Sequence, residues 1–193
     1  IVKQFAEEES LKAEIPENFY ALIAERHIQA SRKVEEAKPE ELLEIAVSNL
    51  PETEQLYYKD QYMRDFEAKV VKVIDNEYVV LDKTCFYPEG GGQPADTGYL
   101  VSNGNKIDVV DVQKVGKVIV HKVKGAVPKE GSIVKGVIDW ELRYSLMKNH
   151  TATHVVNGAA RRVLGQHVWQ FGTQKGVKRS RLDISHYRRL MLE

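Results

Sequence analysis

Hydrophobic and polar positions alternate with a period of two through the middle of this chain. The pattern is clearest in Phe66–Ile74 and Glu77–Asp82, and it recurs in shorter runs near residues 98–101, 106–112, 118–123 and 132–138. Such alternation is typical of strands with one buried face, and Asp75-Asn76 and Asn103-Gly104 predict tight turns between them. Five or six short strands with tight turns predict a small antiparallel barrel or folded sheet.

The apolar spacing becomes helical on both sides of this region. Before it, helices are predicted at Val2–Leu11, from Pro16 through Ile28, and from Pro39 to about Asn49. After it, a helix is predicted from Asp139 to Leu164, with Gly165 as its stop. The fold class is therefore α+β. We expect a helical segment over residues 1–50, a linker over 51–65, a barrel over 66–138, and the start of an α+β core over 139–193.

Size and cysteine content narrow the class of protein. With 193 residues and 42% apolar content, the chain can bury one core and carry a helical appendage. No apolar run reaches the roughly 18 residues of a membrane span, so no membrane partner is expected. The single cysteine, Cys85, excludes an internal disulfide and fits a reducing, cytoplasmic setting. We expect Cys85 to be a small buried residue.

The net charge of zero conceals a gradient along the chain. Residues 1–67 hold 8 Lys and Arg against 16 Asp and Glu, whereas residues 141–193 hold 10 against 3. A basic carboxyl-terminal segment favours an anionic partner, with nucleic acid first. A solvated cationic surface without a specific partner is the alternative.

His150 and His154 are four residues apart within the predicted helix, which places both imidazoles on one face. Neutral ring nitrogens at this spacing can share a metal ion, although such a site needs three or four ligands and only two are evident. The alternative is a half-exposed pair without a ligand. Thr151 stands where zinc proteases carry their glutamate base, so peptide hydrolysis by that mechanism is disfavoured.

Three consecutive glycines, Gly90, Gly91 and Gly92, form the other distinctive motif. They permit backbone angles closed to other residues and let another group approach the main chain closely. No Lys-Ser/Thr follows them, so this is not a phosphate-binding P-loop. Gln93 comes next and can both donate and accept hydrogen bonds. A plain hairpin turn is the alternative reading.

Several motifs together resemble the alanyl-tRNA synthetase family, and in particular its editing portion. They are FYPEGGGQPADTG (86–98), MKNHTATH (147–154) and RLDISH (181–186). The segments IPENFYALIAERH (15–27) and YYKD (57–60) look like the archaeal type of that family. The resemblance covers nearly the whole chain, from the end of the tRNA-recognition region to the start of the editing domain.

The resemblance implies a parent protein that joins alanine to tRNA(Ala) with ATP and clears Ser or Gly wrongly attached to that tRNA. A pocket for alanine barely excludes glycine, because one methyl group changes binding by only about 1–3 kcal/mol, so a second, hydrolytic site is needed. In the family, His150 and His154 would hold zinc together with a Cys and a His of a later CxxxH motif. That motif is absent here, so the chain alone is expected to be inactive. ATP and magnesium would belong to a synthesis domain outside these residues.

The resemblance also suggests roles for other positions. Gln93 and Thr84 are the catalytic or substrate-recognising candidates, Thr84 having the alternative of an ordinary strand residue. The glycines of the turn would contact substrate. Cationic side chains would contact acceptor-end phosphates without reading bases; they are Lys175, Lys178, Arg179 and Arg181. The parent is expected to form a homodimer.

Three alternatives remain open at this point. The chain could be a tRNA-binding or linker module without catalysis, or a free-standing deacylase, which the helical residues 1–50 disfavour. It could also be an unrelated two-histidine metalloenzyme that takes further ligands from Asp96, Asp183 or His186.

Overall fold

A computed structural model describes residues 39–187 and 190, with side chains from residue 43 onward. The chain divides into two compact units after Ile45. Helix α3 spans Pro39–Val47, which confirms the helix predicted from Pro39. The two helices predicted before it lie outside the described residues.

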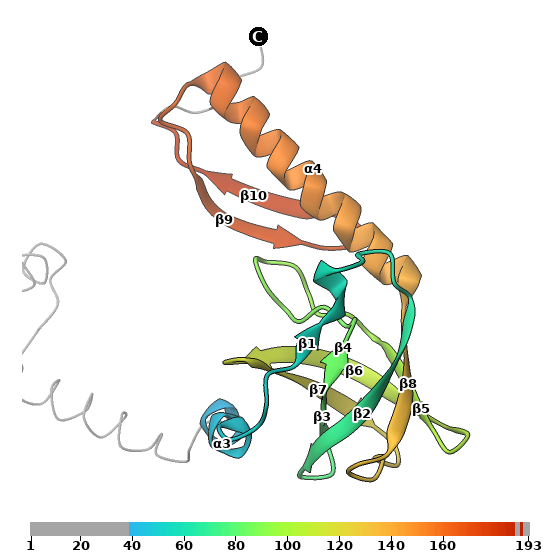
Figure 1. The fold of residues 1–193 in the computed structure, drawn as a ribbon. Coiled ribbons are helices and arrows are strands. Elements are labelled where there is room, and N and C mark those ends of the chain that lie inside the picture. Colours follow the sequence, from blue (N-terminus) through green and yellow to red (C-terminus); the bar gives the residue numbers. More distant parts are fainter. Residues whose placement is uncertain (1–38, 188–189, 191–193) are drawn as a thin grey trace, which may run out of the picture. The chain divides into compact units, whose positions relative to one another are not determined.

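The second unit is built around a closed barrel of six strands (Figure 1). Every neighbouring pair is antiparallel, in the order β2-β3-β7-β6-β5-β8. The mixed α+β class and the small antiparallel barrel predicted from the sequence are confirmed. The strands are β2 (Asp65–Ile74), β3 (Tyr78–Leu81), β5 (Gly98–Ser102), β6 (Asn105–Val115), β7 (Val118–Lys124) and β8 (Ile133–Ile138).

Alternating side chains of each strand fill the barrel. Phe66, Ala68 and Val70 of β2 are buried, while the residues between them face solvent. The ring of Phe66 lies over Gly136 of the paired strand, where a Cβ atom would come within 2.3 Å of it. Glycine at this position therefore makes room for the largest side chain of the β2 core face.

Turns and bulges close the barrel. Asp75 and Asn76 both have φ of 52° and are the central residues of a turn that the hydrogen bond from Glu77 N to Ile74 O, 3.1 Å long, closes. This confirms the turn predicted there. Register shifts in β2 between Val70 and Lys72, and in β6 between Val109 and Asp111, add the local bending that barrel closure needs.

Shorter elements surround the barrel. Strand β1 (Glu54–Gln55) pairs in parallel with β4 (Lys83–Thr84), and the 3-10 helix η1 (Leu56–Tyr58) follows β1. Of these elements, β1 and η1 lie within residues 51–65, which the sequence presents as a linker. After the barrel come α4 (Trp140–Leu164) and a hairpin of β9 (Gln170–Lys175) and β10 (Ser180–Ile184).

Helix α4 begins and ends where its sequence predicts. The carboxylate of Asp139 accepts a hydrogen bond from Leu142 N at 3.1 Å and caps the first turn. Gly165, with φ of 117°, follows Leu164. Over its 25 residues the helix buries only Arg143, Leu146 and Thr153. Much of its surface therefore faces solvent within the described part of the chain.

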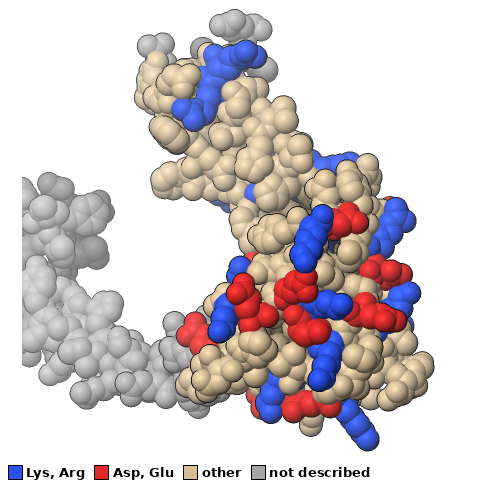
Figure 2. Space-filling view, viewed as in Figure 1, with Lys and Arg blue, Asp and Glu red and all other residues tan. Residues whose placement is uncertain are grey.

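Charge is distributed differently over the barrel and the α4 region. In the view of Figure 2, blue and red side chains are interspersed over the barrel. The part formed by α4 and the hairpin carries mainly blue ones in that view. This agrees with the excess of Lys and Arg over Asp and Glu after residue 140.

Candidate functional site

The two histidines of α4 lie side by side. The ring centroids of His150 and His154 are 5.2 Å apart, and the ring planes differ by 20°. His150 is half-buried and His154 is exposed. The i, i+4 spacing thus produces one ridge of two imidazoles that a ligand can reach.

Gln93 orients the first of these rings. Its side-chain oxygen lies 2.8 Å from His150 Nδ1. Because an amide oxygen only accepts, Nδ1 of His150 carries the proton, and its Nε2 keeps a lone pair for another partner. Burial, followed by the charges of Lys175 and His154, lowers the pKa of His150, which keeps the ring neutral at neutral pH. A neutral imidazole oriented by a hydrogen bond at its other nitrogen is how proteins present histidine to a metal.

The glycine-rich turn holds Gln93 in place. Gly90 and Gln93 exchange two backbone hydrogen bonds, of 3.1 and 2.9 Å, around Gly91 and Gly92, which have φ of 58° and 77°. A Cβ atom on Gly91 would lie 4.0 Å from His150 Cε1. The turn is a tight hairpin whose tip lies against α4.

A second protein segment, β9, approaches the other side of this turn. The backbone nitrogen of Lys175 donates to Gly92 O at 2.6 Å, and its Nζ donates to Gly91 O. A Cβ atom on Gly92 would come within 2.2 Å of Thr173 O, so only glycine allows this approach. The close approach that the three glycines permit is thus made by β9.

Lys175 is buried, whereas the prediction that it contacts RNA phosphates needs an exposed side chain. Only 2% of Lys175 is exposed. Burial lowers the pKa of its ammonium group. Its hydrogen bond to Gly91 O stabilises the turn, and it is not part of the exposed cationic surface.

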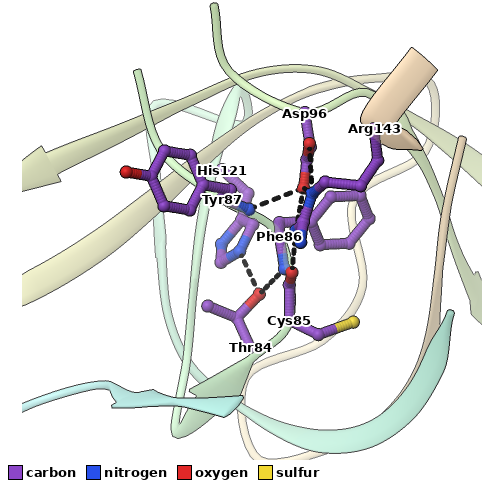
Figure 3. Close-up of polar contacts among 7 residues, drawn as sticks. All are labelled: Thr84, Cys85, Phe86, Tyr87, Asp96, His121 and Arg143. Atoms are coloured by element: carbon purple, nitrogen blue, oxygen red, sulfur yellow. Dashed lines mark hydrogen bonds and ion pairs between the residues drawn. The ribbon is translucent and has the colours of Figure 1, made fainter. Parts of the chain in front are cut away.

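A buried ion pair fixes α4 to the barrel (Figure 3). Arg143 Nε lies 2.8 Å from both carboxylate oxygens of Asp96, and its Nη2 donates to Cys85 O at 2.6 Å. The backbone nitrogen of Tyr87 also donates to Asp96, at 2.7 Å. Asp96 follows Gln93 by three residues, and Arg143 precedes His150 by two helical turns. The pair therefore sets the position of Gln93 relative to His150.

Cys85 and Thr84 belong to the barrel interior. Cys85 is 1% exposed, as expected for a small buried residue, and burial raises the pKa of its thiol to about 12. Thr84 is fully buried, and its hydroxyl lies 2.9 Å from His121 Nε2 and accepts from Phe86 N. His121 Nδ1 donates to Val79 O at 3.0 Å. The substrate role expected for Thr84 stays a prediction. In the structure its hydroxyl is hydrogen-bonded to the buried His121.

A pocket opens beside His150. It has a volume of about 250 Å³ and is bounded by η1 and the segment after it, by the loop before the glycine-rich turn, and by α4. Its lining residues are Tyr57, Tyr58, Gln61, Tyr87, Gln93, Arg143, Met147, His150 and Thr151. We call it the tyrosine pocket. Sequence analysis missed it because three of these residues lie in the apparent linker, although YYKD was noted as a motif.

The remaining cationic candidates lie at the turn and start of β10. Lys178, Arg179 and Arg181 are exposed, and Arg181 forms an ion pair of 2.8 Å with Asp183. Their role toward phosphates stays a prediction. Asp183 therefore forms an ion pair with an arginine, as Asp96 does with Arg143.

The described residues contain no cluster of three or more His, Cys, Asp or Glu side chains that could hold a metal ion. His167 and His186 form a second pair, with 2.8 Å between His167 Nε2 and His186 Nδ1. Asp96, Asp183 and His186 are each bonded to another side chain, and within the described residues none of them joins His150 and His154 in such a cluster. His150 and His154 fit a metal as two of its ligands. Over the described residues, no helix has the length and apolarity to cross a membrane.

The family described as tRNA synthetases class II (A) matches residues 1–142, and this chain belongs to it. Curated relatives are similar over nearly all of the chain, which confirms the archaeal-type resemblance. Alanine--tRNA ligase of Pyrococcus furiosus is 55% identical over 98% of the chain, and those of Pyrobaculum calidifontis and Thermococcus kodakarensis are each 52% identical over 97% and 100%. The chain spans about a fifth of the length of these relatives, 20% or 21% of each.

Proposed function

We propose that this chain is part of an alanine–tRNA ligase, and that its α4 site takes part in hydrolysing Ser- or Gly-tRNA(Ala). The longer protein would use ATP and alanine as substrates and tRNA(Ala) as its RNA partner. Relatives named alanine--tRNA ligase, at 50–55% identity across nearly the whole chain, support the first part. The second part depends on the geometry around His150.

The observation that carries the editing proposal is the hydrogen bond between Gln93 and His150. It directs the His150 Nε2 lone pair away from Gln93, on the same ridge as His154. Zinc sites use neutral histidines that donate their other N–H to a fixed acceptor. The pair would supply two zinc ligands, and further ligands would come from outside the described residues.

Zinc bound there would supply Lewis-acid polarisation and the activation of water for attack on the ester. The residues of the chain have separate tasks. His150 and His154 would hold the metal, Gln93 fixes the tautomer of His150, and the turn with Lys175 keeps Gln93 in place. Lys178, Arg179 and Arg181 would bind acceptor-end phosphates and so orient the ester.

The test compares this chain with a longer version that carries the following residues of the Pyrococcus furiosus relative. We expect the longer version to bind zinc and to hydrolyse Ser-tRNA(Ala). Replacing His154 by Ala should remove both properties, because one of two helical ligands is lost. His167→Ala is the matched control: it also removes a histidine from a stacked pair, but outside the site, and should leave both unchanged.

Unaltered zinc content in the His154→Ala version would contradict the ligand assignment. A second function, an RNA-binding part without catalysis, is favoured by the excess of Lys and Arg over Asp and Glu in residues 141–193. Retained RNA binding without hydrolysis in the longer version would support that function.

A further inference from the structure

The described part of the chain buries two cationic side chains, and only one of them has an acidic partner. Arg143 is paired with both carboxylate oxygens of Asp96. Lys175, which is 2% exposed, forms no ion pair with a carboxylate of the described residues. A buried charge without a partner of opposite sign is unfavourable for the folded state, and such groups occur mainly where function uses them.

The glycine-rich turn uses only part of the Lys175 ammonium group. This group has three N–H donors, and among the described residues the one acceptor bonded to it is Gly91 O. The backbone nitrogen of Lys175, and not its side chain, makes the second bond to the turn, at Gly92 O. Two N–H donors and a positive charge are therefore left for an acceptor that the described residues do not supply.

Gly91 places this ammonium group close to His150. A Cβ atom on Gly91 would lie 4.0 Å from Lys175 Nζ and 4.0 Å from His150 Cε1. At most twice that distance therefore separates the cation from the imidazole ring, and glycine leaves the point beside both without a side chain. We call this point the Gly91 space. Burial and, after it, the charge of Lys175 lower the pKa of His150, so the two groups interact across this space.

We propose that Lys175 is a catalytic residue that binds an anionic oxygen in the Gly91 space. The inference rests on the function proposed above for the identity of this oxygen, which is the ester carbonyl oxygen of Ser- or Gly-tRNA(Ala). Lys175 thereby has a different task from the exposed cations of β10, because it binds the charge that forms during hydrolysis and not the phosphates of the RNA.

Ester hydrolysis creates such a charge at a defined atom. The oxygen of water forms a bond to the carbonyl carbon, and the carbonyl oxygen takes the electron pair of the double bond. When that pair returns, the bond to the ribose oxygen breaks. The ribose oxygen takes one proton of the water, and the other is released with the amino acid. A preorganised N–H donor with a full charge, in a place that excludes water, stabilises the negative oxygen.

The charge of Lys175 affects a metal ion in the opposite way. It repels a divalent cation bound by His150 and His154, so that removing the charge raises the affinity for zinc. If Lys175 served only to support the turn, its removal would lower that affinity, because Gln93 would hold His150 less well. The two roles therefore predict changes of opposite sign in zinc affinity.

Formate is the probe for the anion site in the 193-residue chain. Sodium formate replaces sodium chloride at constant ionic strength, and nitrogen-15 spectra follow the Lys175 amide and the His150 ring. We expect saturable shifts in the unaltered chain and none in Lys175→Met. Gly91→Ala should weaken formate binding about tenfold, because its methyl group fills the Gly91 space while the ammonium group stays in place.

Two matched controls accompany these variants. Gly116→Ala places alanine at the same φ of 58° as Gly91→Ala, but with open space around the Cβ atom. Lys124→Met removes an exposed cation from the end of β7. Both should bind formate as the unaltered chain does, and circular dichroism checks that every variant is folded. Absent saturation in the unaltered chain, or equal binding by Gly91→Ala and Gly116→Ala, would overturn the anion site.

Kinetics and zinc affinity of the longer version test the catalytic role. Lys175→Met should lower kcat for Ser-tRNA(Ala) about a hundredfold and change KM less than about twofold, as expected for a donor that acts when the charge forms. Competition with a chelator should show zinc affinity raised several-fold. Gly92→Ala disturbs the same contact between β9 and the turn but keeps the ammonium group, and it should lower both properties. Lower zinc affinity in Lys175→Met would show that the residue only supports the turn.

The two sets of measurements separate this inference from the proposed function, because formate binding needs neither zinc nor hydrolysis. Binding that depends on Lys175, in a protein whose longer version hydrolyses nothing, would contradict the editing function and leave the anion site standing. Hydrolysis with an unchanged kcat in Lys175→Met would contradict the catalytic role alone. Formate binding by the 193-residue chain but not by the longer version would show that a carboxylate of the longer protein is the partner of Lys175, which also contradicts that role.

Discussion

The barrel and helix α4 are held in place by different forces. In the barrel, alternating side chains such as Val79, Leu100 and Val112 are fully buried, so hydrophobic burial supplies most of the stability. Of the 25 residues of α4, three are buried, and one of these is Arg143. The helix and the hairpin depend on directed polar contacts, namely Arg143 with Asp96 and Lys175 with the glycine-rich turn.

This difference explains how the site is built. Hydrophobic contacts tolerate small shifts of one surface over another, whereas a bidentate ion pair fixes both distance and direction. The candidate ligands are on the helix and their orienting residue Gln93 is on a barrel loop. The ion pair between Arg143 of the helix and Asp96 of the loop therefore determines whether His150 reaches Gln93.

The largest effect on the free energy of unfolding is expected from breaking the ion pair between Arg143 and Asp96. Arg143→Leu leaves the Asp96 carboxylate buried without its partner, which should lower the free energy of unfolding by about 3–5 kcal/mol. Urea unfolding followed by fluorescence measures it. In the double variant Arg143→Leu, Asp96→Leu, much of this loss should be regained, because no charge is left buried. A loss below about 1 kcal/mol in the single variant would show that the ion pair between Arg143 and Asp96 does not hold α4 against the barrel.

An intermediate effect is expected at the contact between the turn and β9. Gly92→Ala should destabilise the protein by about 2–3 kcal/mol, since it combines a left-handed backbone with a clash against Thr173 O. Gly104→Ala is the control, because Gly104 has φ of 81° but open space around its Cβ position. It should cost only about 1 kcal/mol.

Amide hydrogen exchange shows whether the contact between β9 and the glycine-rich turn is lost. The Lys175 amide, which donates to Gly92 O, should exchange much faster in Gly92→Ala and stay protected in Gly104→Ala. Equal stability of the two variants would mean that β9 does not pack against the turn.

The smallest effect is a pH dependence that belongs to the barrel alone. Burial lowers the pKa of His121 from its ordinary 6.5 to about 4. The unfolded chain therefore takes up a proton below pH 6.5 while the folded chain stays neutral until about pH 4. Stability from this group is complete above pH 6.5 and falls as the pH decreases, by about 2 kcal/mol at pH 5.

His121→Gln separates this effect from other acid-sensitive groups. The glutamine amide can replace the bonds to Val79 O and to Thr84 without titrating. The change in unfolding free energy between pH 7.5 and pH 5 should be about 2 kcal/mol smaller in the variant. An equal change in unfolding free energy in both proteins would show that His121 takes up its proton in the folded barrel as readily as in the unfolded chain.

Local patterns were sufficient to predict the barrel and α4. Phe66, Ala68 and Val70 alternate inward as their sequence implies, and Asp139 and Gly165 delimit the helix. The hairpin β9–β10 was missed because Gln170–Lys175 is largely polar and lacks alternation. The strand and 3-10 helix before the barrel were missed because they are only two and three residues long.

The site was only partly predictable for a different reason. The spacing of His150 and His154 is a local property, and their neighbouring rings follow from helix geometry. The partners of His150 and Arg143 lie 57 and 47 residues away, and no local pattern encodes such contacts. The burial of Lys175 has the same origin, since it depends on where the glycine-rich turn meets β9.

The tautomer of His150 tests the central claim most directly, namely that Gln93 presents this imidazole with its Nε2 free. Long-range proton–nitrogen correlation spectra of the nitrogen-15-labelled chain at pH 7.5 distinguish the two ring nitrogens. We expect a protonated Nδ1 and an unprotonated Nε2 at His150, and loss of that preference in Gln93→Leu. A ring protonated at Nε2 in the unaltered chain would contradict it.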